Sequence, residues 1–258
     1  MDKVNIETAK IAIIGSTRLT ERLVNRLEKI NRPKIIFGIN KKNLSKKVNA
    51  FDFSDYCQNK KIEFINNENW NSFIKTCEKK KINLIIEFGD SRIIPEEITK
   101  KYFVIGNHGA ILPNIKGGAS LVWGRMCNTL NWGISIFKVS KKIDEGQILN
   151  ISKFNYENNT SMKEFVSIAD AKTVTCLIDY FSDKKLKNIE TKNSDYKLPL
   201  NCDSYEAIML TLECLKKNKS IYLPRRTIEN CKINNKWPES FIKIFKISNN
   251  IPYPRYYY

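Results

Sequence analysis

The sequence predicts an α/β fold with a Rossmann-like, mostly parallel sheet and helices on both of its faces. Over residues 1–150, short apolar runs alternate with stretches that have apolar residues at helical spacing. This alternation is typical of parallel strands that are joined by helical crossovers. The 258 residues, of which 42% are hydrophobic, are enough to bury one large core and to carry a small appendage.

Each predicted element follows from its local pattern. Apolar runs predict strands at residues 10–15, 34–40, 61–65, 83–89, 102–107, 133–139 and 147–156. Apolar residues at helical spacing predict helices at residues 17–30, 69–81, 117–130, 160–183 and 204–218. An irregular, proline-bearing tail follows the last helix. We therefore expect a main domain over residues 1–200 and a small C-terminal helix and tail region over residues 201–258.

The net charge of the chain is +17, with 44 Lys and Arg residues against 27 Asp and Glu residues. A charge of this size is compatible with nucleic-acid binding. However, the lysines are spread along the whole chain, whereas a nucleic-acid footprint usually clusters them, so compositional drift explains the charge better. A positive field also draws in small anionic substrates such as phosphates and carboxylates. We therefore expect no nucleic-acid partner.

The seven cysteines are scattered without a Cys-x-x-Cys pair, and the chain has one histidine. A zinc site of Cys and His ligands is therefore not expected, nor is any other metal, and the thiols are expected to be reduced. No apolar run reaches the ~20 residues that span a bilayer, and the first residues lack the apolar region of a secretory signal. These patterns favour a cytoplasmic protein without a membrane partner.

The single histidine, His108, comes with Asn107 directly after a predicted strand. Ligands of open α/β sheets bind at the carboxyl ends of the strands, so both polar side chains are expected at that edge. The Gly- and Pro-containing stretch 109–118 predicts a shaped loop. Asp144 lies in a predicted turn, where it either forms an Asx turn or orients His108. A purely structural role is the other interpretation of a lone histidine.

The stretch GNHGAILPNIKGGASLVW at residues 106–123, followed by the Asp of DEGQIL, resembles the folate-dependent formyltransferases. That family includes glycinamide ribonucleotide transformylase, methionyl-tRNA formyltransferase and the nucleotide-sugar N-formyltransferases. The stretches EFGDSRIIPEEI and RRTIENCKINNKWP…PYPRYYY are also similar to the family. The resemblance covers most of residues 10–156 and residues 222–256, and it implies the formyltransferase fold and formyl-transfer activity.

The sequence departs from the family's pattern at one candidate catalytic residue. The usual order is Asn-x-His, but here Gly106 occupies the asparagine position and the carboxamide is on Asn107. Either Asn107 reaches the same place by a different backbone path, which we favour, or the function of the asparagine is altered. The resemblance implies that Asn107 and His108 stabilise an oxyanion, that His108 alternatively takes the amine's proton, and that Asp144 orients His108.

The resemblance also implies the co-substrate, 10-formyltetrahydrofolate, and direct attack of an amine on the formyl group. The residues that match the family's folate-binding segments are Ser91, Arg92, Ile94, Val139 and Ile143. The candidates for contacts with the substrate are Lys116, Gly117 and Tyr222. As alternatives, Arg92 serves surface solubility, Lys116 is a solvated loop lysine, and Tyr222 packs in the core.

Within the family, the chain is most similar to the nucleotide-sugar N-formyltransferases. Methionyl-tRNA enzymes continue after the Pro-Tyr-Pro stretch into a β-barrel domain that helps to hold tRNA, and glycinamide ribonucleotide enzymes lack that stretch. We therefore expect a dTDP- or UDP-linked amino-sugar as partner, with dTDP-4-amino-4,6-dideoxyglucose first and the 3-amino isomer next. The alternatives are a methionyl-tRNA formyltransferase and a non-catalytic, basic nucleic-acid-binding relative. We also expect a homodimer, in which the tyrosines at 256–258 either pack or fray.

Overall fold

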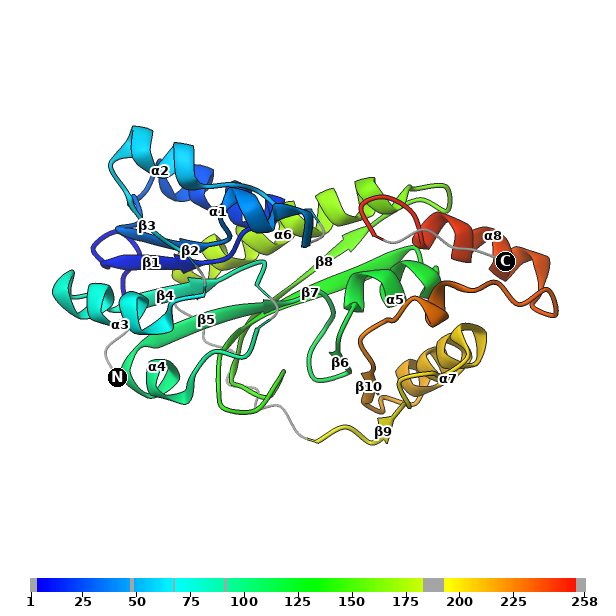
Figure 1. Ribbon diagram of the computed structural model, residues 1–258. Coiled ribbons are helices and arrows are strands. Elements are labelled where there is room, and N and C mark those ends of the chain that lie inside the picture. Colours follow the sequence, from blue (N-terminus) through cyan, green and yellow to red (C-terminus); the bar gives the residue numbers. More distant parts are fainter. Residues whose placement is uncertain (1–3, 47–48, 67, 91, 183–192, 254–258) are drawn as a thin grey trace.

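A seven-stranded sheet forms the centre of the computed structural model (Figure 1), which describes residues 4–46, 49–66, 68–90, 92–182 and 193–253. The strand order is β3-β2-β1-β4-β5-β7-β8. The strands are β1 (Ile11–Ile14), β2 (Ile35–Gly38), β3 (Glu63–Asn66), β4 (Leu84–Glu87), β5 (Phe103–His108), β7 (Asn131–Lys138) and β8 (Ile148–Asn155). The pairs from β3 to β5 are parallel, whereas β7 and β8 form an antiparallel edge. The predicted fold class is confirmed.

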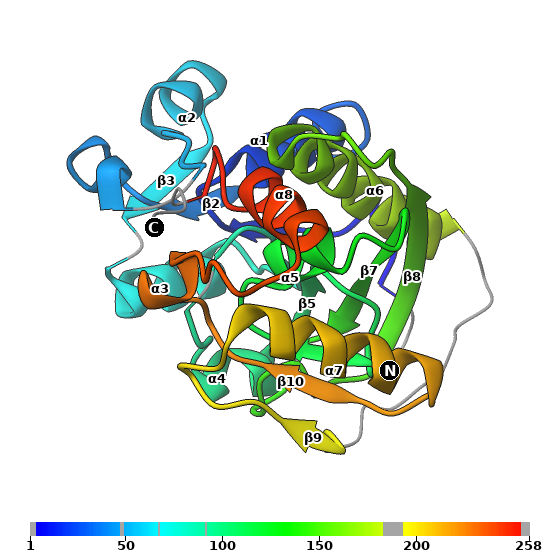
Figure 2. The same ribbon diagram turned by 90° about the vertical axis from the view of Figure 1, so that its right-hand side faces the viewer.

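Helices cover both faces of this sheet (Figures 1 and 2). On the first face, called the α6 face, lie α1 (Arg18–Leu27), α2 (Ser54–Lys60) and α6 (Met162–Ser182); on the second, the α3 face, lie α3 (Trp70–Lys79) and α4 (Glu96–Lys101). Side chains alternate between the faces along each strand, so Ile105 of β5 packs on the α6 face and Val104 on the α3 face. No helix within the described ranges is both long and apolar enough to cross a membrane.

Helix α1 shows how the local sequence sets these elements. Leu19, Leu23 and Leu27 recur at helical spacing and are buried, which ties the helix to the sheet. Thr17 and Thr20 form a capping box at its start, which satisfies main-chain donors that have no partner inside the helix. The hydroxyl of Thr20 also donates to the main-chain oxygen of Phe88 at 2.5 Å. The turn after β1 is therefore filled by its own threonines.

A three-stranded parallel sheet joins the C-terminal region to the loop after β5 (Figure 1). Its strands, in spatial order, are β6 (Ile115–Gly117), β10 (Ile221–Leu223) and β9 (Tyr196–Lys197). Gly117 has φ +98°, and a Cβ atom there would lie 1.8 Å from the carbonyl oxygen of Leu223, so this close pairing requires glycine. The remaining elements are α5 (Ser120–Cys127), α7 (Ser204–Lys216), α8 (Glu239–Ser248) and the 3₁₀ helices η1 (Lys41–Lys46) and η2 (Glu229–Cys231).

Arg226 fastens the C-terminal region to α5. Its guanidinium donates to the main-chain oxygen of Asn230 and to Oδ1 of Asn249, the latter at 2.7 Å. Its Cζ lies 4.7 Å from the ring centroid of Trp123 in α5. The contact with Trp123, like the pairing of β6 with β10, crosses the boundary between residues 1–200 and 201–258. The division of the chain at that boundary stays a prediction.

Arg226→Leu is expected to lower the free energy of unfolding by about 2–3 kcal/mol, because Asn230 and Asn249 lose a charged donor. The neighbouring Arg225 is exposed, so Arg225→Leu is the matched control, and its effect should stay within about 0.5 kcal/mol. Chemical denaturation followed by circular dichroism measures the difference. Equal stability of the two variants would contradict the role given to Arg226.

Asp170 makes the stability of the fold depend on pH. Its side chain is buried in α6, and burial raises the pKa of its carboxyl from 3.8 to about 7, although Arg22 opposes this. Between these two values the unfolded chain has lost the proton and the folded chain still holds it. The unfolded state then binds fewer protons, so the free energy of unfolding falls as pH rises through this window.

Asp170→Asn removes this titration. As the pH rises from 4 to 8, the free energy of unfolding of the variant is expected to increase relative to that of the wild type by on the order of 2–4 kcal/mol. Denaturation at several pH values measures this difference. Asp179→Asn is the control, because Asp179 is exposed on the same helix. If Asp170→Asn keeps the pH dependence of the wild type, another group causes it.

Candidate active site

The carboxyl end of β5 places neighbouring residues on opposite faces of the sheet. The strand stays paired with β7 to its end, where Asn107 lies opposite Ile136 and His108 lies opposite Ser135. Because side chains alternate along a paired strand, Gly106 and His108 lie on the α3 face and Asn107 lies on the α6 face. The structure therefore does not bring Asn107 together with His108. Because the pairing is regular, the backbone does not shift Asn107 into the position of residue 106.

His108 is buried, with 5% of its surface exposed, and each ring nitrogen faces an acceptor. Its Nδ1 lies 3.4 Å from Oδ1 of Asp144, and its Nε2 lies 3.0 Å from the main-chain oxygen of Ile115. A carboxylate and a carbonyl oxygen only accept hydrogen bonds, so an imidazolium with a proton on each nitrogen satisfies both. This environment suits a donor and a positive charge better than a proton acceptor.

Asp144 reaches His108 because the turn between β7 and β8 folds back over the α3 face. The residue has a left-handed backbone, with φ 53°. Its Oδ2 accepts a hydrogen bond of 2.8 Å from the main-chain nitrogen of Gly117 in β6. One carboxylate therefore contacts both the end of β5 and the start of the small sheet. The structure thus brings together His108 and Asp144, and it places the predicted substrate residue Gly117 beside them.

Lys116 lies beside the same turn. Only 2% of its side chain is exposed, and its Nζ lies 3.4 Å from Oε1 of Glu145, so it is not a solvated loop lysine. Burial raises the pKa of Glu145, but Lys116 and Lys142 together outweigh burial and hold the pKa below its ordinary value. Tyr222 of β10 is half-buried and lies opposite Lys116 of β6. Nζ of Lys197 lies 5.5 Å from the centroid of the Tyr222 ring.

The loop between β4 and α4 contains two of the predicted folate residues, Arg92 and Ile94; the third, Ser91, lies outside the described residues. Arg92 donates to both carboxylate oxygens of Asp90, at 3.0 and 2.9 Å, and its Cζ lies 4.8 Å from the ring centroid of Trp70. Ile94 is buried in the core of the α3 face. These side chains hold the loop in place, which leaves ligand contacts to its main chain.

Exposed apolar side chains flank the site on two sides. Ile93 of the β4–α4 loop is 69% exposed, and Ile143 of the β7–β8 turn is 56% exposed. Nζ of Lys141 in the turn lies 3.4 Å from Oε2 of Glu96 at the start of α4, so the turn and this helix are in contact. Apolar edges with main-chain polar groups nearby suit a flat, partly apolar ring such as a pterin. The residues present therefore fit a folate.

Glu87 is a candidate that the sequence analysis did not single out. It ends β4 in register with Gly106 of β5, so its side chain lies on the α3 face together with His108. Its Oε2 lies 3.4 Å from the point where a Cβ of residue 106 would stand, and Cγ2 of Val139 lies 2.8 Å from the same point. The available signal was the charge that interrupts the apolar run NLIIEFG.

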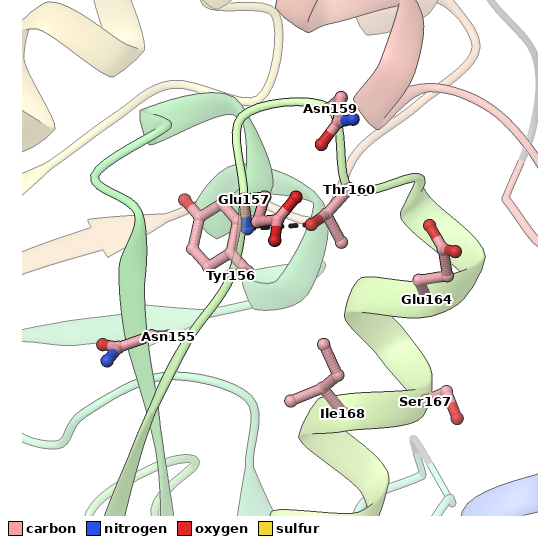
Figure 3. A pocket seen from close by; sticks show the side chains of 8 residues that line it. All are labelled: Asn155, Tyr156, Glu157, Asn159, Thr160, Glu164, Ser167 and Ile168. Carbon is pink, nitrogen blue, oxygen red and sulfur yellow. Dashed lines mark hydrogen bonds between the residues drawn. The ribbon is translucent and has the colours of Figure 1, made fainter.

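A hollow of about 650 Å³ lies between the end of β8 and the start of α6 (Figure 3). Its lining residues are Asn155, Tyr156, Glu157, Asn159, Thr160, Glu164, Ser167 and Ile168. Glu164 caps α6 by accepting a hydrogen bond of 2.9 Å from the main-chain nitrogen of Ser161. The carboxylates of Glu157 and Glu164 disfavour an anionic ligand. The hollow shares no residue with the site around His108, and we do not assign the reaction to it.

Burial makes three of the cysteines poor nucleophiles. Burial raises the pKa of Cys57, Cys77 and Cys127 to about 12, which keeps these thiols protonated and unreactive. Within the described ranges, no three His, Cys, Asp or Glu side chains are grouped so that they could hold a metal ion.

No family model matches the chain, but individual relatives do. A methionyl-tRNA formyltransferase of Prochlorococcus marinus (strain MIT 9215) is 27% identical over 125 residues, which cover 46% of this chain and 38% of the relative. The bifunctional polymyxin resistance protein ArnA of Wigglesworthia glossinidia brevipalpis is 30% identical over 133 residues, which cover 50% of this chain and 18% of the relative. The chain therefore matches less than half the length of either relative.

Solved structures match nearly the whole chain at low identity. HypX from Aquifex aeolicus in complex with tetrahydrofolic acid superposes with a TM-score of 0.63 at 15% identity, covering 94% of this chain and 34% of HypX. An N-formyltransferase from Helicobacter canadensis, in complex with folinic acid and dTDP-3-aminofucose, superposes with a TM-score of 0.64 at 17% identity, covering 93% of this chain and 80% of that enzyme. The methionyl-tRNA formyltransferase from Clostridium thermocellum superposes with a TM-score of 0.61 at 17% identity, covering 96% of this chain and 86% of that enzyme.

The chain has the fold of the folate-dependent formyltransferases. Its relatives in sequence include methionyl-tRNA formyltransferases, and its neighbours in structure include formyltransferases of sugars and of methionyl-tRNA. Two neighbours in structure, HypX and the sugar 3N-formyl transferase WlaRD, were solved with tetrahydrofolic acid and with 5-N-formyl-THF, respectively. The resemblance indicated by residues 106–123 and Asp144 is thereby confirmed.

Proposed function

We propose that this chain is a sugar N-formyltransferase, which transfers the formyl group of 10-formyltetrahydrofolate to the amine of a nucleotide-linked amino-sugar. The observation that carries this proposal is the buried pair of His108 and Asp144 at the carboxyl end of β5. The pair stands beside exposed apolar side chains that fit a folate. The fold and the named neighbours support formyl transfer as the reaction class.

The arrangement around His108 suits the chemistry of formyl transfer. An amine nitrogen attacks the formyl carbon, and negative charge develops on the formyl oxygen. A fixed donor or positive charge near that oxygen lowers the barrier, typically by about 3 kcal/mol. His108 provides this charge, and Asp144 holds its ring in place and balances it. The donor, when bound between the β4–α4 loop and the β7–β8 turn, supplies the activated formyl group.

A dTDP-linked amino-sugar is the proposed substrate, with dTDP-4-amino-4,6-dideoxyglucose as the first candidate and its 3-amino isomer as the second. The Helicobacter canadensis neighbour was solved with dTDP-3-aminofucose, and WlaRD, a sugar 3N-formyl transferase, with dTDP. The net charge of +17 favours a diphosphate. Tyr222, beside Lys197, is the proposed nucleotide contact. A cytoplasmic location and a homodimer stay predictions, and residues 256–258 lie outside the described residues.

A methionyl-tRNA formyltransferase is the second candidate function. Several relatives that match this chain carry that name, and the strong positive charge also favours an RNA substrate. A non-catalytic nucleic-acid-binding relative is favoured by the charge alone. These two candidates differ from the first in a measurable way, because binding that depends on phosphate neutralisation weakens steeply with salt.

The purified protein with 10-formyltetrahydrofolate is expected to add one formyl mass to one member of a panel of dTDP- and UDP-amino-sugars, as measured by mass spectrometry. Addition of a formyl mass to charged initiator tRNA instead would support the second candidate. Tight, salt-sensitive nucleic-acid binding without any mass gain would support the third. A protein that formylates no amino-sugar on the panel contradicts the proposed function.

His108→Asn and Asp144→Asn are each expected to lower kcat/KM by about 10²–10⁴-fold, because they remove the charged pair that stabilises the formyl oxygen. Steady-state kinetics measure the loss, and circular dichroism checks the fold. Lys142→Gln is the matched control in the same turn, because that side chain is 71% exposed, and its turnover should stay within about twofold of wild type. Wild-type turnover in Asp144→Asn would refute the assigned role.

A further inference from the structure

A carboxylate and an imidazole lie on the α3 face of the sheet, at the ends of neighbouring strands. Glu87 at the end of β4 lies in register with Gly106, and His108 follows two residues further along β5. Two residues of an extended strand cover about 6.6 Å, so a small group held between the Glu87 and His108 side chains is within reach of both. Gly106 contributes no side chain of its own to this space.

The environment of His108 leaves the proton of the amine to another group. Both ring nitrogens face acceptors, Asp144 at 3.4 Å and the Ile115 carbonyl at 3.0 Å. Neither ring nitrogen is therefore directed at a substrate amine. The carboxylate of Glu87 can accept one, and it stands on the same face of the sheet.

Glu87 is held in this position by the loop that follows it. Its Oε1 accepts a hydrogen bond of 2.9 Å from the main-chain nitrogen of Asp90, and Asp90 in turn pairs with Arg92 at 2.9 Å. Its Oε2 is the oxygen nearest to Gly106. A Cβ on residue 106 would lie only 2.8 Å from Cγ2 of Val139, so glycine lets the side chains of Val139 and Glu87 pack over β5 at this position. The carboxylate is therefore oriented before a substrate arrives.

We propose that Glu87 is the catalytic residue that binds the attacking amine and accepts its proton, an inference that rests on the proposed function above. A sugar amine arrives largely as an ammonium at neutral pH. Glu87 pairs with this ammonium and takes one proton, so that the nitrogen gains a lone pair. The bond from that nitrogen to the formyl carbon forms, and the bond from the formyl carbon to N10 of the folate breaks. The second proton of the amine goes to N10, and Glu87 returns its own proton to water.

Glu87→Gln tests the charge while keeping the size of the side chain and an oxygen that can accept from Asp90. We expect kcat/KM to fall at least 100-fold, and the acid limb of its pH profile to be lost. The ionisable groups around this position include the Asp90–Arg92 and His108–Asp144 pairs, which the substitution leaves in place. Glu97→Gln, an exposed change on α4, is the matched control and should stay within about twofold of wild type.

Two further measurements separate proton transfer from damage to the loop. Glu87→Asp keeps the charge and should retain at least tenfold more activity than Glu87→Gln. Without folate, calorimetry should show that the wild type binds a dTDP-amino-sugar about tenfold more tightly than the analogue with a hydroxyl at the same carbon. Glu87→Gln should bind the two equally.

The outcomes distinguish this inference from the proposed function. If the wild type formylates an amino-sugar and Glu87→Gln keeps both that turnover and the preference for the amine, the role of Glu87 is overturned and the proposed function stands. If the wild type formylates no amino-sugar, the proposed function fails and the role of Glu87 fails with it. Equal losses in Glu87→Gln and Glu87→Asp would also overturn proton transfer by Glu87.

Discussion

The carboxylate of Asp144 is the contact on which the site depends. One of its oxygens faces His108 at the end of β5, and the other accepts a hydrogen bond of 2.8 Å from the main-chain nitrogen of Gly117. The carboxylate therefore fixes the β7–β8 turn, the histidine and the first strand of the small sheet relative to one another. Charge-assisted hydrogen bonds are stronger than neutral ones, so this side chain supports the arrangement together with the contact between His108 and the main-chain oxygen of Ile115 and the pairing of β6 with β10.

The alternation of side chains along β5 is the second constraint. It assigns position 106 and position 108 to one face of the sheet and position 107 to the other. A carboxamide on Asn107 therefore cannot replace a side chain on residue 106 without a break in the pairing with β7, and β5 has none there. The chemistry of the site must come from groups on neighbouring strands that share the face of His108. This is why the register between β4 and β5 matters as much as the sequence of β5.

Much of the fold could be predicted from the sequence, because long buried elements leave a periodic pattern. The expected helix at 160–183 is α6, Met162–Ser182, and each expected strand overlaps a strand of the large sheet. The strands β6, β9 and β10 have two or three residues each, so they are too short to show a periodic pattern in the sequence. Their pairing depends on contacts between distant segments, and only coordinates reveal these.

The site was predictable in part. Because strand ends carry ligands in α/β sheets, His108 was a candidate, and the family resemblance added Asp144. The burial of Lys116 against Glu145 and the pairing of Arg92 with Asp90 were not predictable, since both depend on how loops fold back. Glu87 was missed because its importance comes from lying beside Gly106 on another strand, and a linear pattern carries no register.

The pairing of β6 with β10 also determines when the site is complete during synthesis of the chain. Residues 115–117 carry the main-chain groups that contact His108 and Asp144, and they find their strand partner only in residues 221–223. Contacts between segments this far apart in sequence form late, because a long loop must close first. A nascent chain whose large sheet has already formed therefore still lacks the strand that supports these groups until residues 221–223 have left the ribosome.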